Sequence, residues 1–128
     1  MKLILLGLLV ALCGSFNEPV QDVFAALKPV LKAGDAQKLA TYLNSSTDIT
    51  IGTTKAPYGK AQAEIVLRDF FRNNPPADFT IVHTGSSKAG LKFAIGQYKS
   101  GKATYSVLIR MKEADKNWLI HEISFVAE

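Results

Sequence analysis

Cysteine is almost absent from this chain, which has only Cys13 among its 128 residues. A single cysteine cannot form an intramolecular disulfide, so the fold depends on its hydrophobic core. Cys13 and two well-separated histidines also lack the spacing of a zinc site. We therefore expect a domain without disulfides, without a bound metal and without a cofactor.

An excess of charge of one sign is also lacking. Fifteen basic and eleven acidic residues leave a formal charge of +4, with no run of five or six like charges, so a nucleic-acid partner is not expected. The apolar fraction of 48% and the charged fraction of 20% are those of an ordinary globular protein. At this length we expect one domain around one core.

The chain also lacks an apolar run long enough to span a membrane. Its run at residues 3–12 falls short of the roughly 20 residues that a spanning helix needs. Met1 and Lys2 precede this run and small residues follow it, which is typical of a cleavable signal peptide. We predict a signal peptide at 1–15, a single domain at 16–128, no permanent membrane span, and export to the periplasm or the extracellular space.

Cys13 leaves two forms of export open. Residues 10–13 resemble the lipobox at which bacterial lipoproteins are cut and acylated, but Leu12 stands where that pattern has Gly, Ala or Ser. We therefore expect cleavage after Gly14 or Ser15 in preference to a lipid anchor on Cys13.

Hydrophobic spacing predicts three helices. The first covers residues 18–32, the second is short and is capped by Asp35, and the third covers 60–72. Pro75 and Pro76 end the third helix, because the residue before a proline is pushed out of helical geometry.

Alternation of apolar and polar residues predicts five strands, at 48–52, 78–85, 91–98, 103–112 and 118–126. Turns at 100–102 and 114–117 indicate that the last four strands form an antiparallel meander. Residues 44–46 are interpreted as a turn and 53–57 as a break. The predicted order is therefore two helices, a strand, a helix and four strands, in the α+β class.

This order resembles that of the nuclear transport factor 2-like, or cystatin-like, superfamily, in which a curved antiparallel sheet curls around the third helix to form a cone. Four segments carry the resemblance, and the first three are similar to a family of short, secreted bacterial domains of unknown function: YGKAQA at 58–63, DFFRNNP at 69–75, HTG at 83–85 with AIG at 94–96, and NWLIHEI at 117–123. The resemblance covers roughly residues 19–126. It implies a cone with helices packed on the sheet and no established activity.

A cone that is open at one end predicts a ligand pocket. Large side chains would either line this pocket or fill the cone, and analogy with the fold leaves both open. The predicted pocket-lining residues are Phe70, Phe79, Phe93, Ile95, Tyr105 and Trp118.

His83 and Asp48 are weak catalytic candidates, and no catalytic residue is assigned. His83 is expected on the same strand face as Phe79 and Ile81, where an imidazole could titrate near neutral pH, but no spacing brings Asp48 to it. Enzymes of the superfamily, such as ketosteroid isomerase-like and dehydratase-like members, use a carboxylate or histidine base in the cone. His121 receives no role.

We therefore expect a noncatalytic binding or interaction domain for an unknown small molecule or protein. One alternative is a small-molecule isomerase- or hydratase-like enzyme, and another is a homodimeric structural module that pairs through its sheet face. Binding predicts an open apolar cavity, whereas the enzyme predicts His83 inside the cone with a carboxylate in reach. The structural module predicts a filled cone and apolar residues on the outer sheet.

Overall fold

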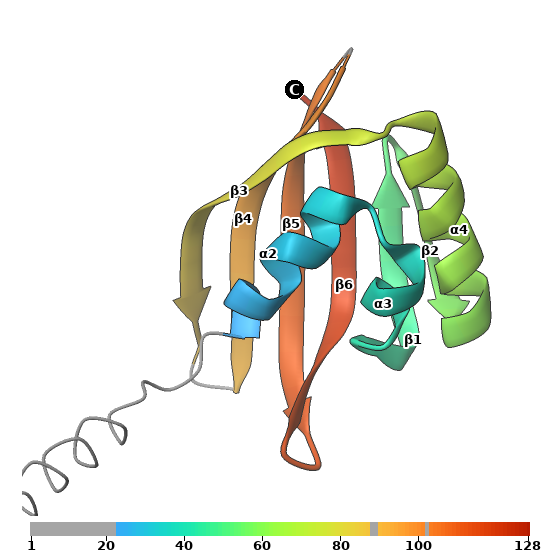
Figure 1. Cartoon of the computed structure of the whole chain (residues 1–128). Helices are drawn as coiled ribbons and strands as arrows, with labels where there is room; N and C mark the ends of the chain where they lie inside the picture. The colour runs from blue at the N-terminus through green and yellow to red at the C-terminus, as the bar shows by residue number, and fades with distance from the viewer. Residues whose placement is uncertain (1–22, 88–89, 102) are drawn as a thin grey trace, which may run out of the picture.

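The computed structural model describes residues 23–87, 90–101 and 103–128. Within these segments the chain forms an α+β fold in which three helices pack on a six-stranded sheet (Figure 1). The predicted signal peptide and the first five residues of the predicted helix at 18–32 lie outside the described residues. No helix in the described segments is long and apolar enough to cross a membrane.

The helices form where the hydrophobic spacing predicts them. They are α2 (Val23–Ala33), α3 (Ala36–Ala40) and α4 (Lys60–Asn73). Asp35 caps α3 as predicted, since its carboxylate accepts a hydrogen bond of 3.0 Å from the backbone N–H of Lys38. The apolar face of α2 is buried against the sheet through Phe24, Leu27, Val30 and Leu31.

Six strands make up the sheet: β1 (Leu43–Ile51), β2 (Thr54–Gly59), β3 (Pro76–Ser86), β4 (Leu91–Ser100), β5 (Thr104–Ala114) and β6 (Asn117–Ala127). Their order across the sheet is β2-β1-β6-β5-β4-β3. The predicted antiparallel meander of the last four strands is confirmed. β1 extends the sheet beyond the meander by pairing in parallel with β6, and β2 then pairs with β1 at the edge.

Two predictions at the start of the sheet are wrong. Residues 44–46 lie within β1 and do not form a turn, and four of the residues at 53–57 belong to a strand, β2. β2 is short, lies at the sheet edge and contains Pro57. Proline is tolerated there because an edge strand has one side without ladder hydrogen bonds. The sheet therefore has one strand more than the predicted order.

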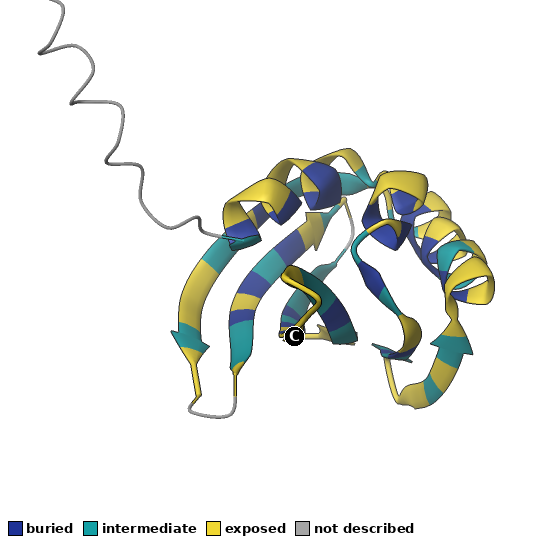
Figure 2. Ribbon diagram, turned by 90° about the horizontal axis from the view of Figure 1, so that it is seen from below, coloured by how far each residue is buried: buried dark blue, intermediate teal, exposed yellow. Residues whose placement is uncertain are grey.

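The sheet is curved because its ladders are interrupted by bulges. The pairing of β3 with β4 shifts between Ile81 and His83, and the pairing of β5 with β6 shifts between Arg110 and Met111. A bulge bends its strand and increases the local twist. Figure 2 shows the resulting arch, in which buried and exposed residues alternate along the strands.

One end of the cone lies where α4 is followed by β3, at the top of Figure 1. Aromatic side chains close this end. This closed end consists of Phe70, Phe71, Tyr98, Tyr105 and Phe125. The Phe70 ring centroid lies 4.4 Å from that of Phe125 and 5.2 Å from that of Tyr105. Such aromatic pairs add stability beyond the apolar area that they bury.

Asn74, which follows α4, binds both tyrosine hydroxyls of the closed end. Tyr98 donates a hydrogen bond to the Asn74 backbone carbonyl at 2.5 Å, and Tyr105 donates to the Asn74 Oδ1 atom at 2.8 Å. Burial raises the pKa of Tyr98 above the ordinary tyrosine value, and the neighbouring Tyr105 adds to the rise. Both hydroxyls therefore serve the packing of this end.

Two glycines of the HTG and AIG segments allow aromatic rings to lie against the backbone. A Cβ atom on Gly96 would lie 2.6 Å from the Thr80 carbonyl oxygen and 2.9 Å from the Phe79 ring. A Cβ atom on Gly85 would lie 2.6 Å from the Phe93 ring. The segments HTG and AIG thus serve packing between β3 and β4.

Candidate functional site

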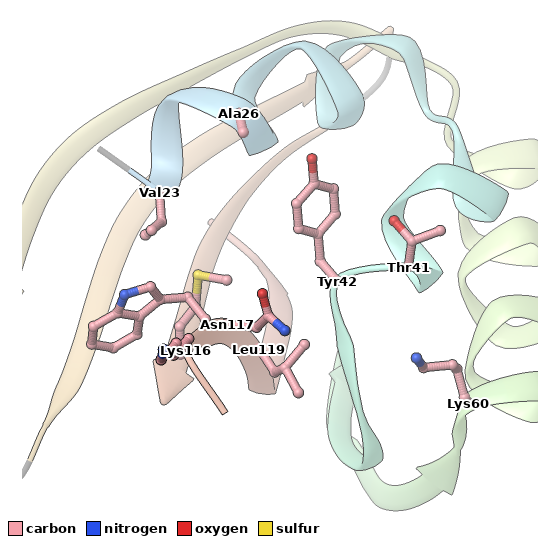
Figure 3. A pocket seen from close by; sticks show the side chains of 10 residues that line it. Val23, Ala26, Thr41, Tyr42, Lys60, Lys116, Asn117 and Leu119 are labelled. Atoms are coloured by element: carbon pink, nitrogen blue, oxygen red, sulfur yellow. The ribbon is translucent and has the colours of Figure 1, made fainter. Parts of the chain in front are cut away.

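The end of the cone opposite the aromatic cluster contains a pocket of about 740 Å³. We call it the open-end pocket. It lies between α2, the turn before β1, the start of α4 and the β5–β6 hairpin (Figure 3). It is lined by Val23, Ala26, Thr41, Tyr42, Lys60, Met111, Lys116, Asn117, Trp118 and Leu119.

Two local structures bring the walls of this pocket together. Asp115 and Lys116 both have positive φ, at 51° and 69°, and form the two-residue turn between β5 and β6. This turn was predicted at residues 114–117, and it places Asn117 and Trp118 at the open end. On the opposite wall, the N–H of Ile120 donates a hydrogen bond of 2.8 Å to the Tyr42 carbonyl, which fixes the turn before β1.

The walls combine an apolar surface with hydrogen-bond donors. Trp118, Met111, Leu119 and Val23 provide the apolar part. Lys60, Lys116, Tyr42 and Asn117 provide ammonium, hydroxyl and amide groups, and Figure 3 shows Tyr42 and Lys60 projecting toward the pocket from different segments. The Lys92 Nζ atom lies 4.7 Å from the centroid of the Trp118 ring, within cation–π range.

Of the six residues predicted to line a pocket, only Trp118 lines the open-end pocket. Phe70 and Phe79 are buried in the core, and Tyr105 packs at the closed end. Phe93 and Ile95 lie on the outer face of β4, because their neighbour Ala94 is buried on the inner face. The sequence left open whether the cone is open or filled, and the structure has a filled end and an open end.

The prediction that His83 shares a face with Phe79 and Ile81 is wrong. The bulge between Ile81 and His83 shifts the register, so that His83 pairs with Ile95 on the outer face. His83 is exposed there, and its ring centroid lies 5.8 Å from that of Phe93. It does not face the interior of the cone.

Asp48 is not brought to His83. It lies on β1, and the three strands β6, β5 and β4 separate β1 from β3. Adjacent strands are about 4.8 Å apart, so this separation is far beyond hydrogen-bond reach. The structure therefore gives the two catalytic candidates no common site.

Asp48 instead lines a shallow pocket of about 310 Å³ on the outer face together with His121, Glu122 and Arg110. Glu122 is paired with Lys55 at 3.7 Å and with Arg110 at 3.5 Å, so acidic and basic side chains are paired on this surface. Among the described residues, no group of three or more His, Cys, Asp and Glu side chains is placed to hold a metal ion.

Sequence reasoning missed most of the residues that line the open-end pocket. Tyr42, Lys60 and Lys116 come from three segments that are far apart along the chain, so no local spacing joins them. Only the predicted topology could have indicated this site. It places the start of the helix at 60–72 and the turn at 114–117 at the same end of the cone, opposite Phe70 and Phe71.

The fold and the pocket define a class: an α+β cone with one packed end and one hollow end. The sequence profile described as a domain of unknown function, DUF4783, matches residues 24–125. The chain therefore belongs to the DUF4783 family. No match was found among curated proteins.

Solved structures agree with this fold. A DUF4783 family protein from Bacteroides uniformis has a TM-score of 0.78 at 23% identity, covering 84% of this chain and 98% of its own. A designed protein of the nuclear transport factor 2-like type has a TM-score of 0.65 at 16% identity, covering 80% and 92%. A cystatin-like domain of unknown function from Nostoc punctiforme has a TM-score of 0.63 at 10% identity, covering 80% and 70%. These structures confirm the predicted fold, a curved antiparallel sheet with helices packed on it.

Proposed function

We propose that this protein is an exported, noncatalytic binding domain that takes a small molecule in the open-end pocket. The pocket itself carries the proposal. Its volume of about 740 Å³ lies in the usual range of small-molecule sites, and its walls combine an apolar part at Trp118 and Met111 with polar groups.

The positions of the two weak catalytic candidates favour binding over the isomerase- or hydratase-like alternative. That alternative needs a base and a supporting carboxylate beside the same ligand. His83 lies on the outer face of β3, and Asp48 lines the shallow pocket on the same face of β1, with three strands between them. The hydroxyls of Tyr98 and Tyr105 are engaged by Asn74 at the closed end.

A pair of helix variants tests the binding proposal. Ala26 is exposed and projects from α2 toward the pocket, whereas its exposed neighbour Ala25 does not line it (Figure 3). Fragments that bind the purified protein in saturation-transfer NMR should lose their signals with Ala26→Trp and keep them with Ala25→Trp. A fragment library without binders, or binders that ignore Ala26→Trp, would contradict the proposal.

Export by a signal peptide at 1–15 is part of the proposal and has its own test. Its support is the pattern of a basic residue, an apolar run and small residues in this segment. Expression in a bacterial host followed by fractionation and intact mass measurement should give a periplasmic or secreted chain that begins near residue 15 or 16. A mass with acyl chains on Cys13 would favour the lipid anchor, and an uncut cytoplasmic chain would contradict export.

The outer sheet face supports a homodimeric module as a second candidate. Ile95 and Val126 are large apolar residues on this face, with exposed fractions of 38% and 43%, and Phe93 lies beside Ile95 on the same strand. A dimer through this face predicts that Ile95→Asp lowers the mass measured by sedimentation to that of a monomer. A wild-type protein that is monomeric at high concentration would contradict the module.

A further inference from the structure

We propose that the ligand of the open-end pocket is a small amphiphilic anion, with an acidic head group on an apolar body. The inference rests on the proposed binding function and names its ligand class. It is carried by cationic side chains that meet an apolar wall in one pocket.

Two lysines line the pocket, and a third lies beside its wall. Lys60 is the first residue of α4 and Lys116 lies in the β5–β6 turn. Lys92 on β4 is not a lining residue, but its Nζ atom lies over the ring of Trp118, which is one. Within the described segments, none of the three lies within 4.0 Å of a carboxylate. Their charges thus remain available to an anion in the pocket, which each would attract.

The pocket walls give these charges no counterpart. None of the ten residues that line it is an acid. Glu64, one turn after Lys60 on α4, is held by Arg68 at 2.7 Å. The shallow pocket on the outer face is different, because its two acids, Asp48 and Glu122, match its two bases, Arg110 and Lys112. Of these two pockets, only the open-end pocket is therefore lined by charges of one sign, which are positive.

Lys116 occupies a backbone position that other residues fit better. Its φ of 69° lies in the left-handed region, where Gly and Asn are favoured and a long side chain is uncommon. Unfavourable backbone conformations are often kept where a side chain has a function. A lysine in this turn is explained if its ammonium group binds the head group of the ligand.

The rest of the pocket suits the remaining parts of such a ligand. Tyr42 and Asn117 carry hydroxyl and amide donors for the oxygens of an acidic head group. Trp118, Met111 and Val23 offer an apolar surface to a chain or ring. An ion with no apolar body would leave this surface without a partner.

The single tryptophan of the chain makes the test direct. Because Trp118 lines the pocket, its fluorescence reports on what enters there. Purified protein is titrated with octanoate, octanol and octylammonium, which share one apolar body and differ in the charge of the head group. We expect octanoate to bind about tenfold or more tightly than either of the others, and to bind more weakly as salt is added.

Lysine variants locate the charge effect. Lys60→Gln and Lys116→Asn should each weaken octanoate binding by roughly fivefold and leave octanol binding unchanged. Lys116→Asn also retains a residue that suits the left-handed turn, so the hairpin is preserved. Lys99→Gln is the matched control. It removes the same charge from an exposed lysine near the end of β4, and Lys99 does not line the open-end pocket. It should bind octanoate as the wild type does.

The outcomes separate this inference from the proposed function. If octanol binds as tightly as octanoate and Ala26→Trp abolishes both, the pocket binds ligands but the anionic class is wrong. If octylammonium binds best, or if Lys99→Gln weakens octanoate as much as Lys116→Asn does, the inference is likewise overturned. If no probe binds, or if binding survives Ala26→Trp, the inference and the proposed function both fail.

Discussion

The two ends of the cone are built on the same strands and have opposite interiors. β5 and β6 contribute Tyr105 and Phe125 to the closed end, and Met111 and Trp118 to the open-end pocket. The difference comes from α4, whose last turn packs Phe70 and Phe71 against aromatic side chains of β4, β5 and β6, whereas its first residue is the exposed Lys60. One helix with aromatic residues at only one end therefore leaves the other end hollow.

The closed end is packed by aromatic side chains, whereas the open end is where we propose that a ligand binds. The closed end also contains the hydrogen bonds from Tyr98 and Tyr105 to Asn74, so it has few groups left for a ligand. Substitutions at the two ends should therefore differ in what they change.

The largest expected effect is on stability at the closed end. Phe70→Ala removes the ring that contacts Phe71, Tyr98, Tyr105 and Phe125, and should lower the free energy of unfolding by about 3–5 kcal/mol. Urea denaturation measures the loss. Ile65→Ala is the control on the same helix. Because Ile65 is 51% exposed, this substitution should change stability by about 0.5 kcal/mol or less. A loss below about 1 kcal/mol for Phe70→Ala would show that the aromatic cluster does not hold this end together.

A smaller loss of stability is expected at Gly96, where β4 lies close to the backbone of β3 and to the Phe79 ring. Gly96→Ala places a methyl group 2.6 Å from the Thr80 carbonyl oxygen, and the strands must shift to accept it. We expect a loss of about 1–3 kcal/mol in urea denaturation. Gly101→Ala is the control, because its Cβ atom would meet nothing within 4 Å. Equal stability of the two variants would contradict the close approach of β3 and β4.

The pH dependence of stability gives a third test of the closed end. Because the pKa of Tyr98 is raised in the folded protein, the unfolded chain loses this proton first, above about pH 10. The stability from this group is complete below that pH and is lost as the pH rises, by up to about 1.4 kcal/mol per pH unit. For Tyr98→Phe, the free energy of unfolding should fall less steeply with pH above about pH 10, by up to that amount per pH unit. Identical slopes for the two proteins would mean that Tyr98 titrates alike in the folded and unfolded chains.

The smallest effect on stability is expected at the open end. Ala26→Trp extends a side chain into space that the pocket leaves open, and should change the free energy of unfolding by about 0.5 kcal/mol or less while it blocks binding. Thermal denaturation beside Ala25→Trp checks this. A large loss for Ala26→Trp alone would mean that the open end is packed as tightly as the closed end.

Much of the fold could be predicted because its signals are local. The apolar spacing of α4, the cap at Asp35 and the alternation of β5 and β6 each involve neighbours in sequence. β2 could not be predicted, because its polar residues and Pro57 become a strand only through pairing with β1. Tertiary pairing there outweighs local preference.

The site could be predicted only in part, because its residues meet through the topology. Trp118 was found by its size and position in a strand, but Lys60, Lys116 and Tyr42 carry no shared local pattern. His83 was misplaced because a single bulged residue reverses the side of the strand on which every later side chain lies. Large aromatic residues in predicted strands therefore indicated the packed interior, as at Phe79 and Tyr105, more often than the pocket, as at Trp118.

The most direct test of the difference between the two ends is a map of amide shifts in ¹H–¹⁵N correlation spectra as octanoate is added to the protein. The account predicts shifts at Tyr42, Lys60, Asn117 and the Trp118 indole, with none at Asn74, Tyr98 or His83. Shifts centred on the closed end or the outer face, or a spectrum that octanoate does not change, would contradict it.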